Sequence, residues 1–165
     1  SSYLGKSKKG ASIMATRACY KFETFPGGDI TPSSHNTVIV YRHWDGYPSG
    51  AQDHLHCILT HKNPFANEQA RHFMECNDRN SGKTTTEETD HVHDDCDYFY
   101  HLAWFPSNRE AIPKPQITVW KSTRYDKHLE GDWAVLFKGS FDHFMITDFK
   151  YYHDFMCPVN AEEYV

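Results

Sequence analysis

The pattern of apolar and polar positions divides the chain into a β-rich start, a helical middle and a β-rich second half. Residues 15–25 (A-T-R-A-C-Y-K-F-E-T-F) alternate between apolar and polar side chains, which predicts a strand with one solvated face. Residues 37–43 are rich in β-branched and aromatic side chains and predict a second strand. The Pro- and Gly-containing segment between them predicts a long loop, so that the two strands form a hairpin.

Two amphipathic helices are predicted in the middle of the chain. The first begins at Ser49 or Gly50 and ends at about His61, with Ser49 as a reasonable N-cap. Its apolar stripe consists of Ala51, Leu55, Ile58 and Leu59. The second covers residues 67–76, with Asn67 as its cap. Its predicted outward positions are Glu68, Arg71, His72 and Glu75, and its predicted inward positions are Ala70, Phe73 and Met74.

The second half of the chain predicts the rest of a sheet. Residues 77–95 contain almost no apolar side chain and are expected to form a long surface loop. Four β-type segments follow at residues 98–105, 116–122, 133–138 and 141–147, the last two joined by a tight turn at residues 139–140. We therefore predict an α+β fold, with a mostly antiparallel sheet of about six strands and two helices packed on one face.

The two ends of the chain differ from its middle in composition. Residues 1–13 are small, polar and basic, which is typical of an N-terminal extension or a tag. We expect a single α+β domain over residues 14–165, with no regular element assigned to residues 148–165. No apolar stretch approaches the roughly 20 residues of a membrane span, and no signal peptide is recognisable. The expected location is cytoplasmic or virion-associated.

The charge balance argues against a dedicated nucleic-acid binder. The chain has 17 basic and 22 acidic residues and a formal net charge of -5, whereas contacts to many phosphates need a clustered cationic surface. Aromatic residues make up 15% of the chain, with 10 Tyr and 11 Phe, and surplus aromatic side chains commonly lie at interfaces. Composition therefore favours binding to a protein partner, or to further copies of the same chain as a homo-oligomer, and not to a membrane or a nucleic acid.

The cysteines form neither a zinc-finger pattern nor a disulfide framework. Their number is odd, their spacing is wide and there is no C-x-x-C; they are Cys19, Cys57, Cys76, Cys96 and Cys157. Reduced or buried thiols are the expected state, and one or two disulfides are the alternative in an exported protein. Cys57 and Cys76 fall on predicted helices without a recognisable activating neighbour.

The segment Y-R-H-W-D-G-Y-P at residues 41–48 joins the second predicted strand to the first helix. His43, oriented by Asp45, has the chemistry of a general base, with Arg42 steadying an anion. In the alternative interpretation the turn is structural: Asp45 binds backbone N–H groups and Trp44 fills the core. No nucleophile or second carboxylate cluster accompanies the turn elsewhere, which favours the structural role and leaves catalytic residues unassigned.

A metal site is the hypothesis for the segment D-H-V-H-D-D at residues 90–95. On an extended backbone His91 and His93 lie on the same side, and Asp94 could complete a Zn or Mn site. A solvated acidic loop is the alternative, and no other cofactor is expected. His54 and His56 lie on a predicted helix, where rings two residues apart point about 200° from each other and cannot share an ion.

Basic and aromatic residues alternate in the later strands. Such a pattern can hold a nucleotide or single-stranded nucleic acid, although a solvated sheet face is the alternative. The basic members are Lys114, Lys121, Arg124, Lys127 and His128. Trp120 and Tyr125, together with Trp44 and Tyr47 of the central turn, are the predicted binding residues.

Several segments resemble a group of small uncharacterised phage and bacterial proteins. The matching segments are M-A-T-R at residues 14–17, Y-R-H-W-D-G-Y-P at 41–48, the aromatic strand at 97–100 and G-D-W at 131–133. Proteins of that group begin with M-G-T-R and carry Y-C-H-W-D-G-Y-P, so Ala15 replaces a Gly and Arg42 a Cys. The resemblance implies a phage or mobile-element origin and no mechanism.

Three functions remain as expectations. The first is a non-enzymatic interaction or self-assembling protein of viral or microbial origin that binds through an aromatic-rich surface. The second is a metal-dependent hydrolase or nuclease that uses the His/Asp cluster of His43, Asp45, His91, His93 and Asp94. The third is a small-nucleotide-binding phage anti-defence protein.

Overall fold

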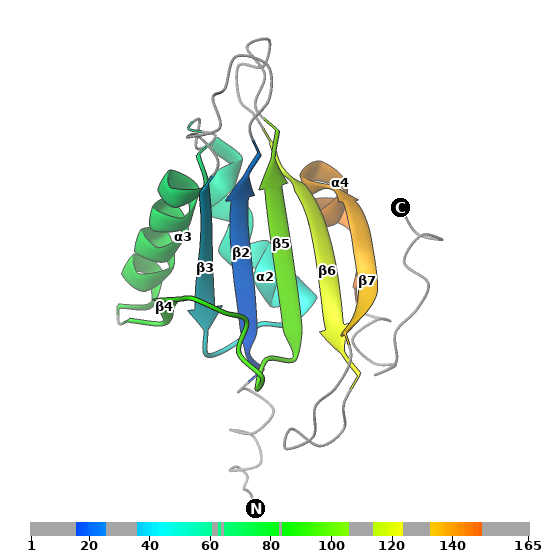
Figure 1. The fold of residues 1–165 in the computed structure, drawn as a ribbon. Coiled ribbons are helices and arrows are strands. Elements are labelled where there is room, and N and C mark those ends of the chain that lie inside the picture. Colours follow the sequence, from blue (N-terminus) through cyan, green and yellow to red (C-terminus); the bar gives the residue numbers. More distant parts are fainter. Residues whose placement is uncertain are drawn as a thin grey trace, which may run out of the picture.

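One six-stranded sheet organises the part of the chain that this computed structural model describes (Figure 1). The described residues are 16–25, 36–60, 63, 65–82, 84–105, 114–123 and 133–149. The strands lie in the order β4-β3-β2-β5-β6-β7. Their bounds are β2 Ala18–Thr24, β3 Asn36–Arg42, β4 Thr86–Thr89, β5 Tyr98–Trp104, β6 Gln116–Ser122 and β7 Trp133–Ser140. The neighbouring strands β2 and β5 are parallel and the other pairs antiparallel, which confirms the predicted mostly antiparallel α+β sheet.

Helices cover one face of this sheet, as predicted. They are α2 Pro48–Leu55, the 3-10 helix η2 His56–Thr60, α3 Ala66–Ser81 and α4 Phe141–Ile146. Leu55 of α2 and Phe73 of α3 pack in one buried cluster with Tyr20 and Phe22 of β2, because alternate side chains of a strand point to the same side. The α4 residue Phe144 joins this cluster from the other end of the sheet. The opposite sheet face carries a smaller cluster around Cys19, Tyr41 and Cys96.

Both helices begin within one or two residues of their predicted starts, but the predicted N-caps Ser49 and Asn67 are wrong. Helix α2 begins at Pro48 with Tyr47 in the N-cap position, and Pro suits a first helical position, where the missing N–H is not needed. Helix α3 begins after Phe65, and the backbone N–H of Ala66 donates to the Thr24 hydroxyl at 2.6 Å. The cap of α3 is therefore supplied by the sheet and not by Asn67.

The predicted surface loop at residues 77–95 contains regular structure. Helix α3 continues to Ser81 and ends at Gly82, whose φ of 74° is readily adopted by glycine. The Asp78 carboxylate then accepts the Thr85 backbone N–H at 2.9 Å, and the edge strand β4 follows and pairs with β3. The side chains of an edge strand can remain exposed, so β4 needs no apolar pattern. For this reason its polar sequence did not predict a strand.

The strand and tight turn predicted at residues 139–147 are also wrong. Strand β7 extends to Ser140, whose hydroxyl accepts the backbone N–H of His143 at 3.1 Å and so caps helix α4. Phe141 and Phe144, one helical turn apart, point into the core. The Asp142 carboxylate in the first turn of α4 forms an ion pair with Lys114, whose Nζ lies 3.1 Å from Oδ2.

Other predictions lie outside the described residues. They concern the extension at residues 1–13, the binding residue Tyr125 and the segment from residue 150 to the end of the chain. Within the described residues, no helix has the length and hydrophobicity that crossing a membrane requires.

Candidate functional site

The turn between β3 and α2 is anchored on the sheet. The buried Tyr100 hydroxyl donates to the Gly46 carbonyl oxygen at 2.6 Å, and the Gly46 N–H donates to the Thr16 carbonyl oxygen at 2.9 Å. Asp45 has a φ of 57°, and its carboxylate accepts the Tyr47 hydroxyl at 3.3 Å. Trp44 is 40% exposed, so the interpretation of this residue as part of the core is wrong.

The predicted acid–base residues of this turn have different partners. The His43 ring packs edge-on against Tyr41, at 4.6 Å between centroids, and its Nε2 lies 3.9 Å from a Glu87 carboxylate oxygen. Asp45 instead binds Tyr47, as described above. Arg42 is on the opposite face of β3, buried beneath the helices. The described contacts thus give His43 an acidic neighbour other than the one predicted.

The histidine-rich segment lies against the same tyrosine. The His91 and His93 rings stack at 4.8 Å, and His93 stacks on Tyr41 at 4.2 Å. His91 Nδ1 contacts Asp90 at 2.6 Å, and His93 Nε2 contacts the Thr89 hydroxyl at 2.9 Å. Asp94 is exposed. The structure therefore brings His43 and His93 to one tyrosine ring, while the metal site at His91, His93 and Asp94 stays a prediction.

The predicted alternation of basic and aromatic residues divides between the two faces of β6. Trp120 is on the face without helices, where it stacks on Phe99 at 5.0 Å. Lys121 is buried on the helical side, and its Nζ donates to the Tyr98 hydroxyl at 3.0 Å. These neighbours in sequence therefore do not form one binding surface.

A pocket of ≈ 600 Å³ lies between the α2–η2 segment and α3. This volume is within the range of about 300–1,000 Å³ that is typical of small-molecule sites. We call it the Arg42 pocket; its lining residues are Arg42, Asp53, His54, His56, Cys57, Cys76, Asn77, Asn80 and Ser81. The Asn77 side-chain amide donates to the carbonyl oxygens of Phe73 at 2.7 Å and His54 at 3.3 Å, so it links the two helical walls.

Arg42 brings a buried positive charge into this pocket. Arg42 is 7% exposed, and its Nη1 donates to the Thr85 hydroxyl at 2.9 Å. Its Nε is buried and, among the described residues, has no hydrogen-bond partner. Burial lowers the pKa of the guanidinium, while Tyr20, Asp45 and Asp78 raise it. Because arginine stays protonated in proteins, the pocket contains a buried positive charge with an unpaired Nε–H.

His54 adds a neutral ring beside that charge. Its Nδ1 is buried without a hydrogen-bond partner among the described residues. Burial, together with the charge of Arg42, lowers the pKa of His54 to about 3. The imidazole is therefore neutral at pH 7 and can donate or accept one hydrogen bond in the pocket.

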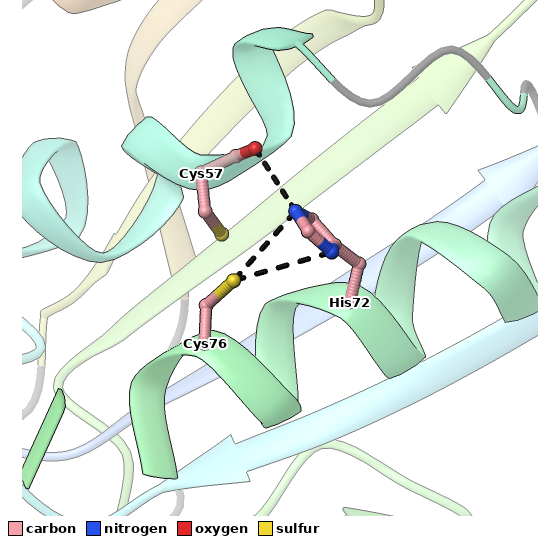
Figure 2. A group of neighbouring side chains, drawn as sticks. All are labelled: Cys57, His72 and Cys76. Carbon is pink, nitrogen blue, oxygen red and sulfur yellow. Dashed lines mark hydrogen bonds between the residues drawn. The ribbon is translucent and has the colours of Figure 1, made fainter. Parts of the chain in front are cut away.

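The two cysteines of the pocket lining lie close to a histidine (Figure 2). We call this group, formed by Cys57, His72 and Cys76, the Cys-His-Cys cluster. One potential ligand atom from each residue lies within 4.8 Å of the others. Cys57 comes from η2, whereas His72 and Cys76 are one turn apart on α3. Burial, with the neighbouring Cys76, raises the pKa of Cys57 to about 12, so this thiol is protonated at neutral pH and is not an activated nucleophile.

Sequence reasoning missed this cluster. His72 was predicted to point outward, but its Nε2 lies 3.2 Å from the Cys57 carbonyl oxygen, and it is half-buried. The spacing H-x-x-x-C, which places His72 and Cys76 on one helix face, was the available local signal. Cys57 comes from another helix, so the third member is visible only in the folded structure.

Comparison with known proteins gives no assignment: no family model, no curated protein and no solved structure matches this chain. The resemblance to small phage and bacterial proteins therefore stays a prediction.

Proposed function

We propose that the protein binds a small anionic ligand, carrying a phosphate or a carboxylate, in the Arg42 pocket. The observation that carries this proposal is the buried Arg42 guanidinium, which lines the pocket and has an unpaired Nε–H. Removing an unpaired charge from water costs several kcal/mol, and an anion that accepts its hydrogen bonds offsets that cost. Among the described residues, no carboxylate forms an ion pair with Arg42, although Asp45 and Asp78 offset part of its charge without direct contact.

The surroundings of Arg42 favour a small ligand over a polymer. The pocket is of small-molecule size, and the chain has a formal net charge of -5, which disfavours a long polyanion. The neutral His54 ring supplies a further hydrogen-bonding atom without a competing charge. The exposed Asp53 carboxylate is the one acidic side chain in the lining, and it favours a ligand with few negative charges. Small nucleotides fit this description.

The proposal is tested by calorimetric titration and thermal shift of the full chain. The probes are inorganic phosphate, adenosine monophosphate, cyclic mono- and dinucleotides and a dicarboxylate. Arg42→Gln removes the charge, and we expect it to weaken binding by about 1.5–3 kcal/mol, or roughly 10- to 150-fold in Kd. Arg71→Gln is the matched control, because it removes the same charge from an exposed position of α3 outside the pocket lining.

Two results would count against the proposal. One is a parent protein whose melting temperature and titration heat respond to none of these anions. The other is binding that survives Arg42→Gln unchanged in a variant shown by circular dichroism to be folded. Equal loss in Arg71→Gln would point to a nonspecific charge effect.

A second candidate is binding through the sheet face on which the described part of the chain places no helix (Figure 1). On this face Phe99 stacks on Trp120 at 5.0 Å and meets Trp133 edge-on at 6.1 Å, an arrangement that supports a role for aromatic side chains in recognition. The partner would be another protein or a second copy of the chain. Light scattering over a range of concentrations should then show a dimer or larger assembly that Trp120→Ser weakens; a monomer at all concentrations would rule out self-assembly.

A further inference from the structure

The Cys-His-Cys cluster has the composition of a zinc site. Thiolate sulfur and imidazole nitrogen are the ligands that zinc prefers, and two Cys with one His is a set found in catalytic sites that keep a fourth position open. The proposed function makes no use of these side chains. They lie together on two different helices, so their meeting is a property of the fold and not of the local sequence.

The distances are close to those of a tetrahedral site. With zinc–sulfur and zinc–nitrogen bonds of about 2.3 and 2.1 Å, tetrahedral geometry places ligand atoms about 3.5–3.8 Å apart. Cys76 Sγ lies 4.0 Å from His72 Nδ1, the nitrogen that would bind the metal, and 3.6 Å from Nε2. The potential ligand atoms of all three residues lie within 4.8 Å of one another. Figure 2 shows both sulfur atoms on the same side of the imidazole ring. A small side-chain movement would therefore form the site.

The surroundings of His72 support this interpretation. Its Nε2 lies 3.2 Å from the Cys57 carbonyl oxygen. Metal-binding histidines commonly donate their second ring N–H to a backbone carbonyl, a contact that fixes the tautomer and the orientation of the ring. In that tautomer Nδ1 is the ring nitrogen that would bind the metal. His72 is thus held by the backbone of the residue whose thiol is its proposed partner.

We propose that Cys57, His72 and Cys76 bind one zinc ion at the wall of the Arg42 pocket, with the fourth coordination position open to that pocket. Cys57 and Cys76 both line the pocket, whereas His72 is not among its lining residues. Water or an anionic ligand would occupy the fourth position. This inference goes beyond the proposed anion binding, because three protein ligands are sufficient to hold the ion.

The test measures metal directly on the full chain, free of any polyhistidine tag. We expect mass spectrometry of metal content to give one zinc ion per chain after dialysis. After zinc removal, Co²⁺ added alone should give thiolate-to-cobalt charge-transfer absorption and the intense visible bands of a tetrahedral site. Cys76→Ser and His72→Gln should each weaken zinc binding by at least roughly 100-fold. The double variant His91→Gln/His93→Gln is the control and should keep the ion.

Other outcomes would overturn the proposal. A parent chain that neither carries zinc nor takes up Co²⁺ would do so without reference to any variant. So would a Cys57–Cys76 disulfide found by peptide mapping, or zinc that is lost in His91→Gln/His93→Gln and kept in His72→Gln. Anion binding is measured separately by titration of the zinc-free chain, so one proposal can fail while the other holds.

Discussion

The rings of Tyr20 and Tyr100 stack at 4.8 Å between centroids on the neighbouring strands β2 and β5, but their hydroxyl groups are in opposite situations. The Tyr100 hydroxyl donates to the Gly46 carbonyl oxygen at 2.6 Å, whereas the buried Tyr20 hydroxyl has no partner among the described residues. Burial raises the pKa of both phenols, so both stay protonated.

This difference gives a matched pair of variants. Tyr100→Phe should lower the free energy of unfolding by about 1–3 kcal/mol, because the buried Gly46 carbonyl loses its donor. Tyr20→Phe removes the same atom from an unpaired site and should be within about 0.5 kcal/mol of the parent, or more stable. Urea unfolding measures both. Equal losses of unfolding free energy in the two variants would contradict the stabilising role of the hydrogen bond from Tyr100 to Gly46.

Gly46 is required by the close approach of its turn to β2. A Cβ atom at Gly46 would lie 2.7 Å from the Ala18 Cβ and 2.9 Å from the Arg17 carbonyl carbon. Because these atoms belong to or directly precede a central strand, they cannot easily move away. We expect Gly46→Ala to lower the free energy of unfolding by about 1–3 kcal/mol, as overpacked substitutions do.

Gly82 provides the control for Gly46. A Cβ atom at Gly82 would meet nothing within 4 Å, but the φ of 74° favours glycine. Asn tolerates this left-handed conformation, so Gly82→Asn should cost less than about 1 kcal/mol in urea unfolding. If Gly82→Asn were as damaging as Gly46→Ala, the packing argument for the central turn would lose its basis.

Ser140 caps α4, which gives a third stability prediction. Ser140→Ala removes the hydroxyl that accepts the His143 N–H at 3.1 Å and should lower the free energy of unfolding by about 1 kcal/mol. Ser140→Asp should retain most of the stability, since Asp also accepts this bond. Ser49→Ala is the control: Ser49 is exposed and does not cap α2, so its loss should change stability by less than about 0.5 kcal/mol. A larger effect at Ser49 than at Ser140 would contradict the observed caps.

The accuracy of the sequence predictions follows the amount of burial. The apolar spacing of β2 indicated the strand, but the predicted solvated face is wrong: six of its seven residues are buried and Lys21 is half-buried. Strand β2 is central, and side-chain clusters cover both of its faces. Strand β4 was missed because Glu87 and Glu88 are exposed on the edge of the sheet, and a polar edge strand resembles a loop in sequence. Helix α4 has six residues, too few to separate a helical period from a strand period. Pairing with β3, which is distant in sequence, therefore determines β4, whereas the local cap at Ser140 determines α4.

The candidate site was less accessible to sequence reasoning than the fold. The sequence associated Arg42 with an anion, a role that our proposal retains, but placed it beside His43 and Asp45. Adjacent residues of a strand point to opposite faces, and for this reason Arg42 lies under the helices and His43 does not. The Cys-His-Cys cluster joins two helices across 15 positions of sequence between Cys57 and His72, a separation that only tertiary packing closes.

The depressed pKa of His54 predicts how stability depends on pH. The folded protein holds the pKa of this ring at about 3, through burial and the charge of Arg42, against an ordinary value near 6.5. Below pH 6.5 the unfolded chain binds a proton at His54 that the folded chain does not bind. The contribution of the neutral His54 ring to the free energy of unfolding is therefore complete above pH 6.5, and it is lost progressively as the pH falls toward 3.

We expect His54 to account for about 1–2 kcal/mol of the decrease in unfolding free energy between pH 7 and pH 5. Urea unfolding at the two pH values, for the parent and for His54→Gln, isolates this contribution, because the variant lacks the titrating ring. His56→Gln is the matched control: His56 lines the same pocket but is exposed, so this variant should keep the pH dependence of the parent. If His54→Gln lost as much stability as the parent over this range, the imidazole would not be held neutral in the pocket, and a charged His54 would join Arg42 in attracting the anion.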